Sequence, residues 1–366
     1  MTRALVLGAT GHIGAHVVRA LLGKGYAVRA SYRNPRYRFV LDGLPVERVH
    51  VDVEDPRQLR AALDGCELVF VCAGYYPRFT DRHDEAIRRG IEQVRRICDV
   101  LNACPVSRIV YTSSTATIAP VSGRPATEHD QEPWPLTHWS PHLFARRRCA
   151  IRTAAVPPQA GRPPPVGRRE EVGGWRPLYA SVKIAMEHTV ERYAREGLPM
   201  VIVNPSVCLG EYDAHLFSGR LILLFGRTTR RSPVYLHASF NAVYTGDVGV
   251  GHVLAAERGV PGERYLLTGE NLSLGELARR VAREAKVPPP RWCIPYSLAM
   301  AAATMTELAA WLTRTDPLLP RRAIHSARLP QCLDGSKARR ELGLPQTPID
   351  EAIRRALAWF RQHGYL

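Results

Sequence analysis

Residues 4–14 read ALVLGATGHIG, an apolar run of strand length that leads directly into three glycines. Over residues 13–23 the apolar side chains recur at helical spacing, so the glycines stand in a turn between a strand and a helix. Glycine lets a backbone approach a pyrophosphate, and a helix N-terminus supplies free N–H groups and the positive end of the helix dipole. We therefore predict that this turn binds a dinucleotide. The residues expected to do so are Gly8, Thr10, Gly11, His12, Ile13 and Gly14.

Short apolar stretches alternate with amphipathic stretches as far as residue 204. The expected strands are 4–7, 27–31, 46–51, 68–72, 108–112 and 200–204. The expected helices are 13–23, 56–63, 84–102 and 178–196. This alternation is typical of an α/β fold, and we predict a Rossmann doubly wound parallel sheet followed by a smaller C-terminal substrate-binding part.

The chain divides into two parts on this pattern. We assign residues 1–204 to an NAD(P)-binding Rossmann domain and residues 205–366 mainly to substrate binding, with about 240–262 returning to the first domain. The regular segments expected in the second part are a strand at 263–267, a helix at 274–285 that Ser273 caps with Glu276 in the capping-box position, and a last helix at 349–363.

One window does not fit the alternation. Residues 137–176 contain six prolines, eight arginines and only two acids, and neither helical nor strand periodicity runs through 154–169. We interpret this window as a long irregular loop or a disordered insert.

The formal net charge of +16 raises the question of a nucleic-acid partner. The cations are nearly all arginines, and they are spread along the chain rather than gathered in one tract. We therefore expect a solvated basic surface and no nucleic-acid partner. The eight cysteines form no cluster with histidine, so we expect neither a metal site nor a disulfide framework.

No export or membrane segment is visible in the sequence. Residues 298–312 are rich in alanine but carry Glu307, and the stretch is too short and too polar to span a bilayer, so we interpret it as a packed helix. We expect a cytoplasmic protein with no membrane partner.

The end of the second strand bears on the choice of dinucleotide. A site for NAD usually places an acid there, but residues 31–36 read SYRNPR, and Arg33 stands where a guanidinium can grip a 2′-phosphate. The sequence favours NADP, with NAD as the alternative. Asp52 and Val53, after the third strand, are expected to contact the adenine.

Tyr179 and Lys183 form the second strong signal. Residues i and i+4 share one face of a helix, so the phenol and the ammonium should point the same way. A nearby cation favours the phenolate and lowers the pKa of a tyrosine, which makes it a usable acid or base. The chain has fourteen tyrosines but only four lysines, and no other pair has this spacing.

Residues 110–115 read VYTSST and end the fifth strand with hydroxyl groups. The carboxyl end of such a strand faces the ligand crevice, where a hydroxyl can hydrogen-bond a substrate oxygen. Ser114 and Thr115 are both candidates, and the sequence does not decide between them.

Together, the glycine turn, the hydroxyl-rich strand end and the Tyr-x-x-x-Lys pair resemble an extended short-chain dehydrogenase/reductase. The chain is especially similar to the NAD-dependent epimerase/dehydratase family, including hopanoid-associated sugar epimerases and dihydroflavonol-4-reductase-like proteins. The resemblance implies that Ser114 or Thr115 orients the substrate oxygen, Tyr179 transfers the proton and Lys183 holds the nicotinamide ribose. The further cofactor contacts that it implies are Ala73, Gly74, Pro205 and Ser206, besides Tyr179 and Lys183 themselves.

The chain departs from this family at three places. The loop after the fourth strand, residues 72–76, reads CAGYY and brings two tyrosines toward the expected substrate. Gly90 stands where the family has an active-site asparagine, which puts a proton relay behind the lysine in doubt. The 137–176 window is foreign to the family, whose link between the hydroxyl strand and the tyrosine is much shorter.

Three functions are open on the sequence alone. The first is an NAD(P)-dependent oxidoreductase that acts on a carbonyl or secondary alcohol of a small molecule. The second is a nucleotide-sugar epimerase or dehydratase with tightly bound cofactor, and the third is a non-catalytic dinucleotide-binding protein. Substrate contacts are expected from loops 75–79 and 211–217. Whether the chain forms a homodimer is left open.

Overall fold

The computed structural model describes residues 2–77, 81–121, 123–132, 178–227, 234–313, 321, 324 and 331–366. Its centre is a seven-stranded sheet in the order β10-β6-β5-β4-β1-β2-β3, and every pair of neighbours is parallel. The strands are β1 (Arg3–Leu7), β2 (Ala27–Tyr32), β3 (Glu47–His50), β4 (Leu68–Val71), β5 (Arg108–Thr112), β6 (Met200–Pro205) and β10 (Arg264–Leu267). The predicted doubly wound α/β fold is confirmed.

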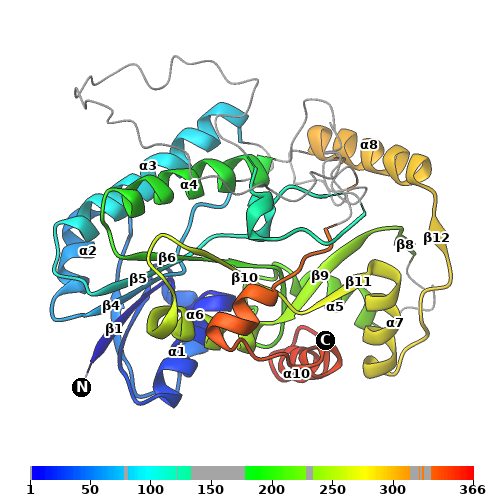
Figure 1. Cartoon of the computed structure of the whole chain (residues 1–366). Coiled ribbons are helices and arrows are strands. Elements are labelled where there is room, and N and C mark those ends of the chain that lie inside the picture. Colours follow the sequence, from blue (N-terminus) through cyan, green and yellow to red (C-terminus); the bar gives the residue numbers. More distant parts are fainter. Residues whose placement is uncertain are drawn as a thin grey trace.

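Helices cover both faces of this sheet (Figure 1). On one face lie α1 (His12–Gly23) and α6 (Thr245–Arg258), and on the other lie α2 (Pro56–Leu63), α3 (His83–Asn102) and α4 (Leu178–Arg195). Each layer has its own apolar core, because the parallel strands are buried on both sides. Segment 245–258 thus packs against α1 in the first part of the molecule although it follows β9 in the chain.

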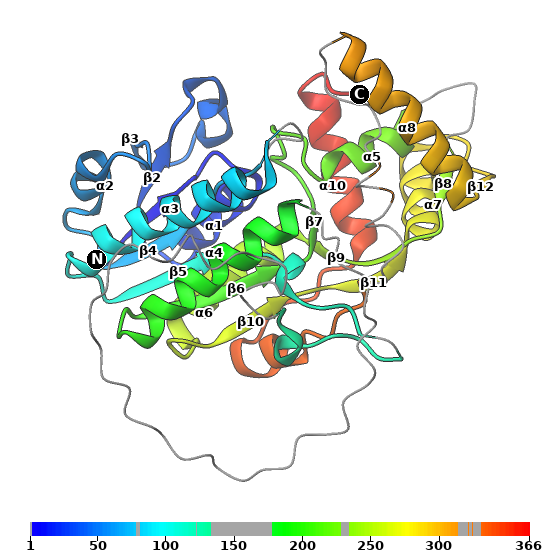
Figure 2. The ribbon, with the colours of Figure 1, turned by 90° about the horizontal axis from the view of Figure 1, so that it is seen from above.

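A smaller part is built around a third apolar core. It contains the sheet of β7 (Val207–Leu209), β9 (Ser239–Tyr244) and β11 (Glu270–Ser273), and the helices α5 (Gly219–Gly226), α7 (Leu274–Ala285) and α10 (Ile349–Gln362). At its margin β8 (Tyr235–Leu236) pairs with β12 (Cys293–Ile294), and α8 (Tyr296–Thr313) follows (Figure 2). The short helices are η1 (Pro35–Leu41), η2 (Thr115–Thr117), η3 (Glu128–Asp130) and η5 (Ala338–Leu342).

The expected helices and strands agree with the structure to within a few residues at their ends. The Ser273 cap is confirmed, since the Ser273 hydroxyl accepts a hydrogen bond from the Glu276 backbone N–H at 3.1 Å. The 137–176 window lies outside the described residues. None of the helices in the described ranges combines the length and the apolar character that a bilayer span requires.

Candidate active site

The loops after β1, β2, β4, β5 and β6 meet at the carboxyl edge of the sheet, because the strands are parallel. The residues expected to bind the cofactor and substrate therefore come from distant parts of the sequence to one edge.

The glycine turn is a tight backbone cradle. Gly8 has φ +79°, a conformation that favours glycine, and a Cβ at this position would lie 2.9 Å from the Ala73 backbone nitrogen. A Cβ at Gly14 would lie 2.2 Å from the Gly8 carbonyl oxygen. Gly11 stands at the N-cap of α1 and provides no side chain to cap it. The start of α1 is thus open to an anion, which fits the diphosphate of a dinucleotide.

The side chains within this turn face inward. Thr10 and His12 are both buried, and His12 Nε2 lies 2.9 Å from the Thr245 hydroxyl at the start of α6. His12 Nδ1 lies 3.9 Å from Asp213 Oδ2, and burial lowers the pKa of His12. The imidazole of His12 is thus engaged by partners within the protein. Ile13, the second residue of α1, packs against the apolar core on this face of the sheet.

Residues after β2 and β3 lie side by side because these strands pair. Arg33 is exposed at the end of β2, and its carbonyl contacts the His50 ring nitrogen at 3.1 Å. Asp52 accepts a hydrogen bond from the Glu54 backbone N–H at 3.1 Å, which turns its carboxylate toward its own turn, while Val53 is buried.

Tyr179 and Lys183 share the buried face of α4, as their spacing predicted. Lys183 is 3% exposed, and its Nζ lies 4.9 Å from the Tyr76 ring centroid and 5.9 Å from that of Tyr179. A Cβ at Gly74 would lie 3.2 Å from this Nζ, so the loop after β4 approaches the ammonium closely. The Tyr76 ring stacks on Tyr179 at a centroid distance of 5.5 Å, and Phe217 stands 4.7 Å beyond Tyr76. Three aromatic rings are therefore grouped at the candidate acid.

The pKa of Tyr179 differs from the sequence-based expectation. Burial raises it, while hydrogen bonds with Ser114 and Tyr76 act to lower it. Burial also lowers the pKa of Lys183 to about 8, against the opposing pull of Glu187. The expectation that Lys183 draws the tyrosine toward neutrality is wrong for this structure, because desolvation dominates at both groups.

Ser114, rather than Thr115, is the hydroxyl that contacts the Tyr179 phenol. Its own carbonyl accepts a hydrogen bond from the Asn204 amide at 3.1 Å, and Thr115 opens the short helix η2. The structure thus brings one of the two candidates to the phenol and leaves the other at the start of a turn.

Glu187 holds the helix that carries Tyr179 and Lys183 in place. It was not predicted as a site residue from the sequence. It lies one turn after Lys183, is fully buried, and accepts hydrogen bonds from Ser113 and, at 2.6 Å, from the Asn204 amide. Arg264 of β10 reaches its other oxygen at 2.8 Å. Helix α4 is thereby tied to the ends of β5 and β6, and the spacing of four residues after Lys183 was the signal that could have revealed it.

Asp213 was also missed. Its two carboxylate oxygens accept hydrogen bonds from the backbone N–H groups of Phe217, at 3.1 Å, and of Gly219, at 2.7 Å. Asp213 thus shapes the loop that brings Phe217 against Tyr76. In the same region Pro205 ends β6, and the Ser206 hydroxyl donates to Asn241 Oδ1 at 2.7 Å, so Ser206 joins the sheet edge to the smaller part.

Gly90 has a steric role that the family resemblance did not suggest. A Cβ at this position would lie 3.0 Å from Val182 Cγ1 and 3.1 Å from Met186 Cγ. The missing side chain lets α3 approach α4 closely, and an asparagine in its place would have to displace these neighbours.

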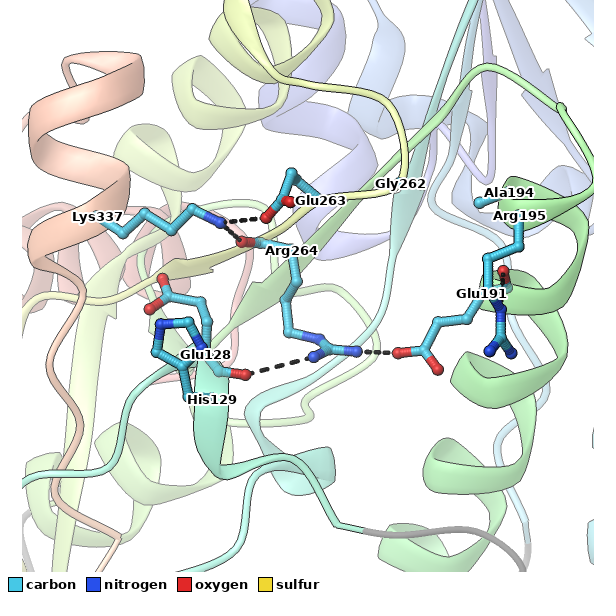
Figure 3. Close-up of a pocket in the computed structure, with 9 residues that line it drawn as sticks. All are labelled: Glu128, His129, Glu191, Ala194, Arg195, Gly262, Glu263, Arg264 and Lys337. Atoms are coloured by element: carbon cyan, nitrogen blue, oxygen red, sulfur yellow. Dashed lines mark hydrogen bonds and ion pairs between the residues drawn. The ribbon is translucent and has the colours of Figure 1, made fainter. Parts of the chain in front are cut away.

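Two cavities are lined by residues other than Tyr179 and its aromatic neighbours. One, of about 260 Å³, is lined by residues at the β10 edge of the sheet, and its charges pair with one another: Lys337 with Glu263 at 2.7 Å, and Arg264 with Glu191 (Figure 3). Lys337 also donates to the Arg264 carbonyl at 3.0 Å, which covers the edge strand. We interpret this cavity as a structural feature of the groups that cover the β10 edge of the sheet.

The other cavity, of about 500 Å³, is lined on one side by Arg36 and Tyr37 and on the other by His215 and Arg220. Burial lowers the pKa of His215, and the positive charge of Arg33 adds to this effect.

Comparison with known proteins identifies the family. The model of the NAD dependent epimerase/dehydratase family matches residues 4–148 and 145–268, two pieces that meet inside the 137–176 window. The chain is 31% identical to sterol demethylase protein B of Methylococcus capsulatus, over 99% of both chains. It is 30% identical to a Synechocystis protein provisionally named a dihydroflavonol 4-reductase, over 99% of this chain and 95% of the relative.

A solved structure shows the same relationship. The nucleoside-diphosphate-sugar epimerase of Pseudomonas aeruginosa is 27% identical, with a TM-score of 0.74 over 100% of this chain and 99% of the other. The family match covers more than half of the chain and includes the glycine turn, the Ser114 loop and the Tyr179 helix. The chain is therefore an enzyme of the extended short-chain dehydrogenase/reductase type, and it belongs to the NAD-dependent epimerase/dehydratase family.

Proposed function

We propose that this enzyme is an NADPH-dependent reductase of an apolar, largely planar carbonyl compound. The observation that carries the proposal is the placement of the Tyr179 phenol against Ser114, with the buried Lys183 ammonium 5.9 Å from the Tyr179 ring. When bound, the nicotinamide supplies the hydride donor or acceptor.

The proton chemistry falls to Tyr179. A phenol whose pKa is raised by burial holds its proton at neutral pH, which suits a group that donates to a carbonyl oxygen as it becomes an alkoxide. Ser114 lies within hydrogen-bonding reach of the same phenol and would orient the substrate oxygen. Lys183, beside Gly74, would hold the ribose of the cofactor.

The remaining cofactor contacts follow from the sheet edge. We assign the diphosphate to residues 8–14, the adenine side to Asp52 and Val53, and the nicotinamide side to Ala73, Gly74, Pro205 and Ser206. We retain residues 1–204, with about 240–262, as the cofactor-binding domain, and most of 205–366 as the substrate-binding part.

The preference for NADPH rests on charge at the end of β2. Arg33 is exposed there, residues 31–36 contain no acid, and Arg36 and Arg220 line the cavity of about 500 Å³. A 2′-phosphate suits such a guanidinium, whereas NAD offers only a hydroxyl.

The aromatic cleft bears on the substrate class. Tyr76 and Phe217 are 44% and 54% exposed beside Tyr179, a surface suited to a flat, apolar molecule. The relative that carries a dihydroflavonol 4-reductase name agrees with this direction.

The test measures NADPH oxidation with a panel of aromatic and alicyclic ketones. Tyr179→Phe should reduce kcat/KM by about 10²–10⁴, the usual contribution of a positioned general acid. Tyr193→Phe is the matched control, because Tyr193 lies on the same helix but donates to Asp99 at 2.5 Å away from the cleft. A Tyr179→Phe enzyme as active as the wild type would refute the assignment.

The cofactor preference has its own test. Arg33→Ala should weaken NADPH binding by about tenfold or more and leave NADH binding unchanged, because a charged hydrogen bond contributes about 1.5–3 kcal/mol. Arg60→Ala, which removes an exposed arginine of α2, should change neither.

Epimerisation or dehydration of a nucleotide sugar is the second candidate, favoured by the likeness to the Pseudomonas epimerase. In that case nucleotide sugars would be converted without net consumption of NADPH, and the purified protein would retain its cofactor. The same panel, extended to nucleotide sugars and read by chromatography, separates the two.

A further inference from the structure

Helix α8 packs against the rest of the protein through its smallest side chains. Ala299 and Ala303 are fully buried in a small cluster with Ile294 of β12 and Leu236 of β8, and Ala310 is 7% exposed. Alanines four and seven residues apart lie on one side of a helix, so this side faces inward.

The opposite side of α8 carries its largest apolar side chains. Leu298, Met305, Leu308 and Leu312 are 58%, 65%, 49% and 67% exposed. Their spacings of seven, three and four residues place them on one face, outward from the alanines. The one charged residue of the helix, Glu307, pairs with Arg321 at 2.6 Å and lies off this face.

We call this outward face, together with two tryptophans at its ends, the α8 patch. Trp292 precedes the helix and is 71% exposed, and Trp311 near its end is 74% exposed. Of twelve exposed large apolar side chains in the described residues, six belong to residues 292–312. Scattered apolar side chains are ordinary on a protein surface, but a concentration on one helix marks a contact surface. Both views place α8 at the outer margin of the smaller part (Figures 1 and 2).

Charge indicates what the patch contacts. The chain has a net charge of +16, and exposed Lys286 and Arg291 precede α8 in the sequence. Two such cationic molecules repel each other, whereas an anionic lipid surface attracts them. Tryptophan is the residue type that prefers the boundary between headgroups and acyl chains.

We propose that the α8 patch docks the enzyme on the surface of an anionic lipid bilayer. The helix lies in the plane of the interface, with the leucines and Met305 among the upper acyl carbons and the tryptophans at the headgroup level. This peripheral contact differs from the expectation of no membrane partner, which rested on the lack of a spanning segment. It is independent of the reaction proposed above.

The test is co-sedimentation of the full chain with vesicles of phosphatidylcholine alone and of phosphatidylcholine mixed with an equal part of phosphatidylglycerol. Binding should be strong only to the mixed vesicles and should weaken with added salt. The double variant Met305→Ser/Leu312→Ser should bind at least about tenfold more weakly, because each large apolar side chain returned to water contributes more than 1.4 kcal/mol. Leu224→Ser/Val260→Ser is the matched control, since both residues are 54% exposed outside α8.

Tryptophan fluorescence gives a second readout. Mixed vesicles should shift the emission of the wild type to shorter wavelength, and Trp292→Phe/Trp311→Phe should remove most of that shift. Circular dichroism of each variant establishes that it is folded. Failure of the folded wild type to bind mixed vesicles, or equal binding by the Met305/Leu312 variant, overturns the proposal. The proposal is also overturned if sedimentation velocity shows a dimer for the wild type and a monomer for this variant. The patch would then bind a second copy of the chain.

Discussion

Helices α4 and α8 both depart from the ordinary pattern of a surface helix, in opposite directions. Helix α4 turns Lys183 and Glu187 inward, where they are 3% and 0% exposed, whereas α8 turns Met305 and Leu312 outward at 65% and 67%. A buried charge costs free energy unless it is paired, and an exposed large apolar side chain forgoes roughly 1.5–3 kcal/mol of burial. Neither departure helps the fold on its own.

The difference between the two helices lies in where their partners are. Around Glu187 the partners come from this chain, with Ser113, Asn204 and Arg264 all within hydrogen-bonding distance. On the outward face of α8 the apolar side chains meet solvent. A helix face with buried charges that pair within the chain indicates an internal site. A helix face with large apolar side chains in solvent indicates contact with another molecule or surface.

The largest expected effect is at Glu187. Glu187→Ala removes a buried acceptor that Ser113, the Asn204 amide and Arg264 share, and it should lower the free energy of unfolding by about 3–5 kcal/mol. Unfolding in urea measures this. Glu85→Ala is the control, because its pair with Arg89 is solvent-exposed and should contribute little to stability. If both variants lost the same free energy of unfolding, buried and surface charges would not differ in their contribution to stability.

Lys183 should show the cost of its burial through pH. Its pKa is lowered from 10.5 to about 8, so the folded state binds the proton less tightly than the unfolded state. Below pH 8 both states are protonated and the fold bears the full cost, up to about 3 kcal/mol; the cost disappears as the pH rises from 8 to above 10.5.

Lys183→Met should therefore be more stable than the wild type at pH 7, and the gain should shrink toward pH 10. Urea unfolding of both proteins at the two pH values checks this, because titration of the other groups cancels in the difference. Lys24→Met, at a partly exposed pair with Glu257, should show no such trend. A gain that does not depend on pH would mean that packing, rather than the charge, is responsible.

The sequence predicted what depends on neighbours along the chain. The glycine turn and the Tyr179/Lys183 pair are local signals, and the structure shows the turn geometry and the shared helix face directly. The pKa of Tyr179 could not be predicted in the same way, because burial of the phenol in the fold raises it while contacts with Ser114 and Tyr76 act to lower it. The partners of Glu187, among them Ser113, Asn204 and Arg264, are distant in the sequence, and no local pattern links them.

Helix α8 shows a different limit. Its existence was predicted from residues 298–312, but a helix that is apolar all round gives no sequence signal for which face turns inward. Packing decided the matter, because only the alanine face approaches β8 and β12 closely. Gly90 is similar, since its absent side chain gains meaning only when Val182 and Met186 are placed against it.

An intermediate effect is expected at Gly90. Gly90→Ala places a methyl group 3.0–3.1 Å from Val182 and Met186, and it should destabilise the fold by about 1–3 kcal/mol despite the better helix propensity of alanine. Gly23→Ala is the matched control, because a Cβ there meets nothing within 4 Å. If both substitutions stabilise the protein equally in urea unfolding, the close approach of α3 and α4 does not constrain this position.

The smallest effect is expected on the outward face of α8. Leu308→Ser should change the free energy of unfolding by no more than about 0.5 kcal/mol in the absence of lipid, because its side chain is already half in solvent. Ala303→Leu, on the fully buried side, should instead cost about 1–3 kcal/mol through overpacking. Thermal and urea unfolding of both variants tests the orientation of the helix directly. A large loss of unfolding free energy in Leu308→Ser would show that other parts of the chain cover this face. The face would then resemble that of α4, whose partners lie within the chain.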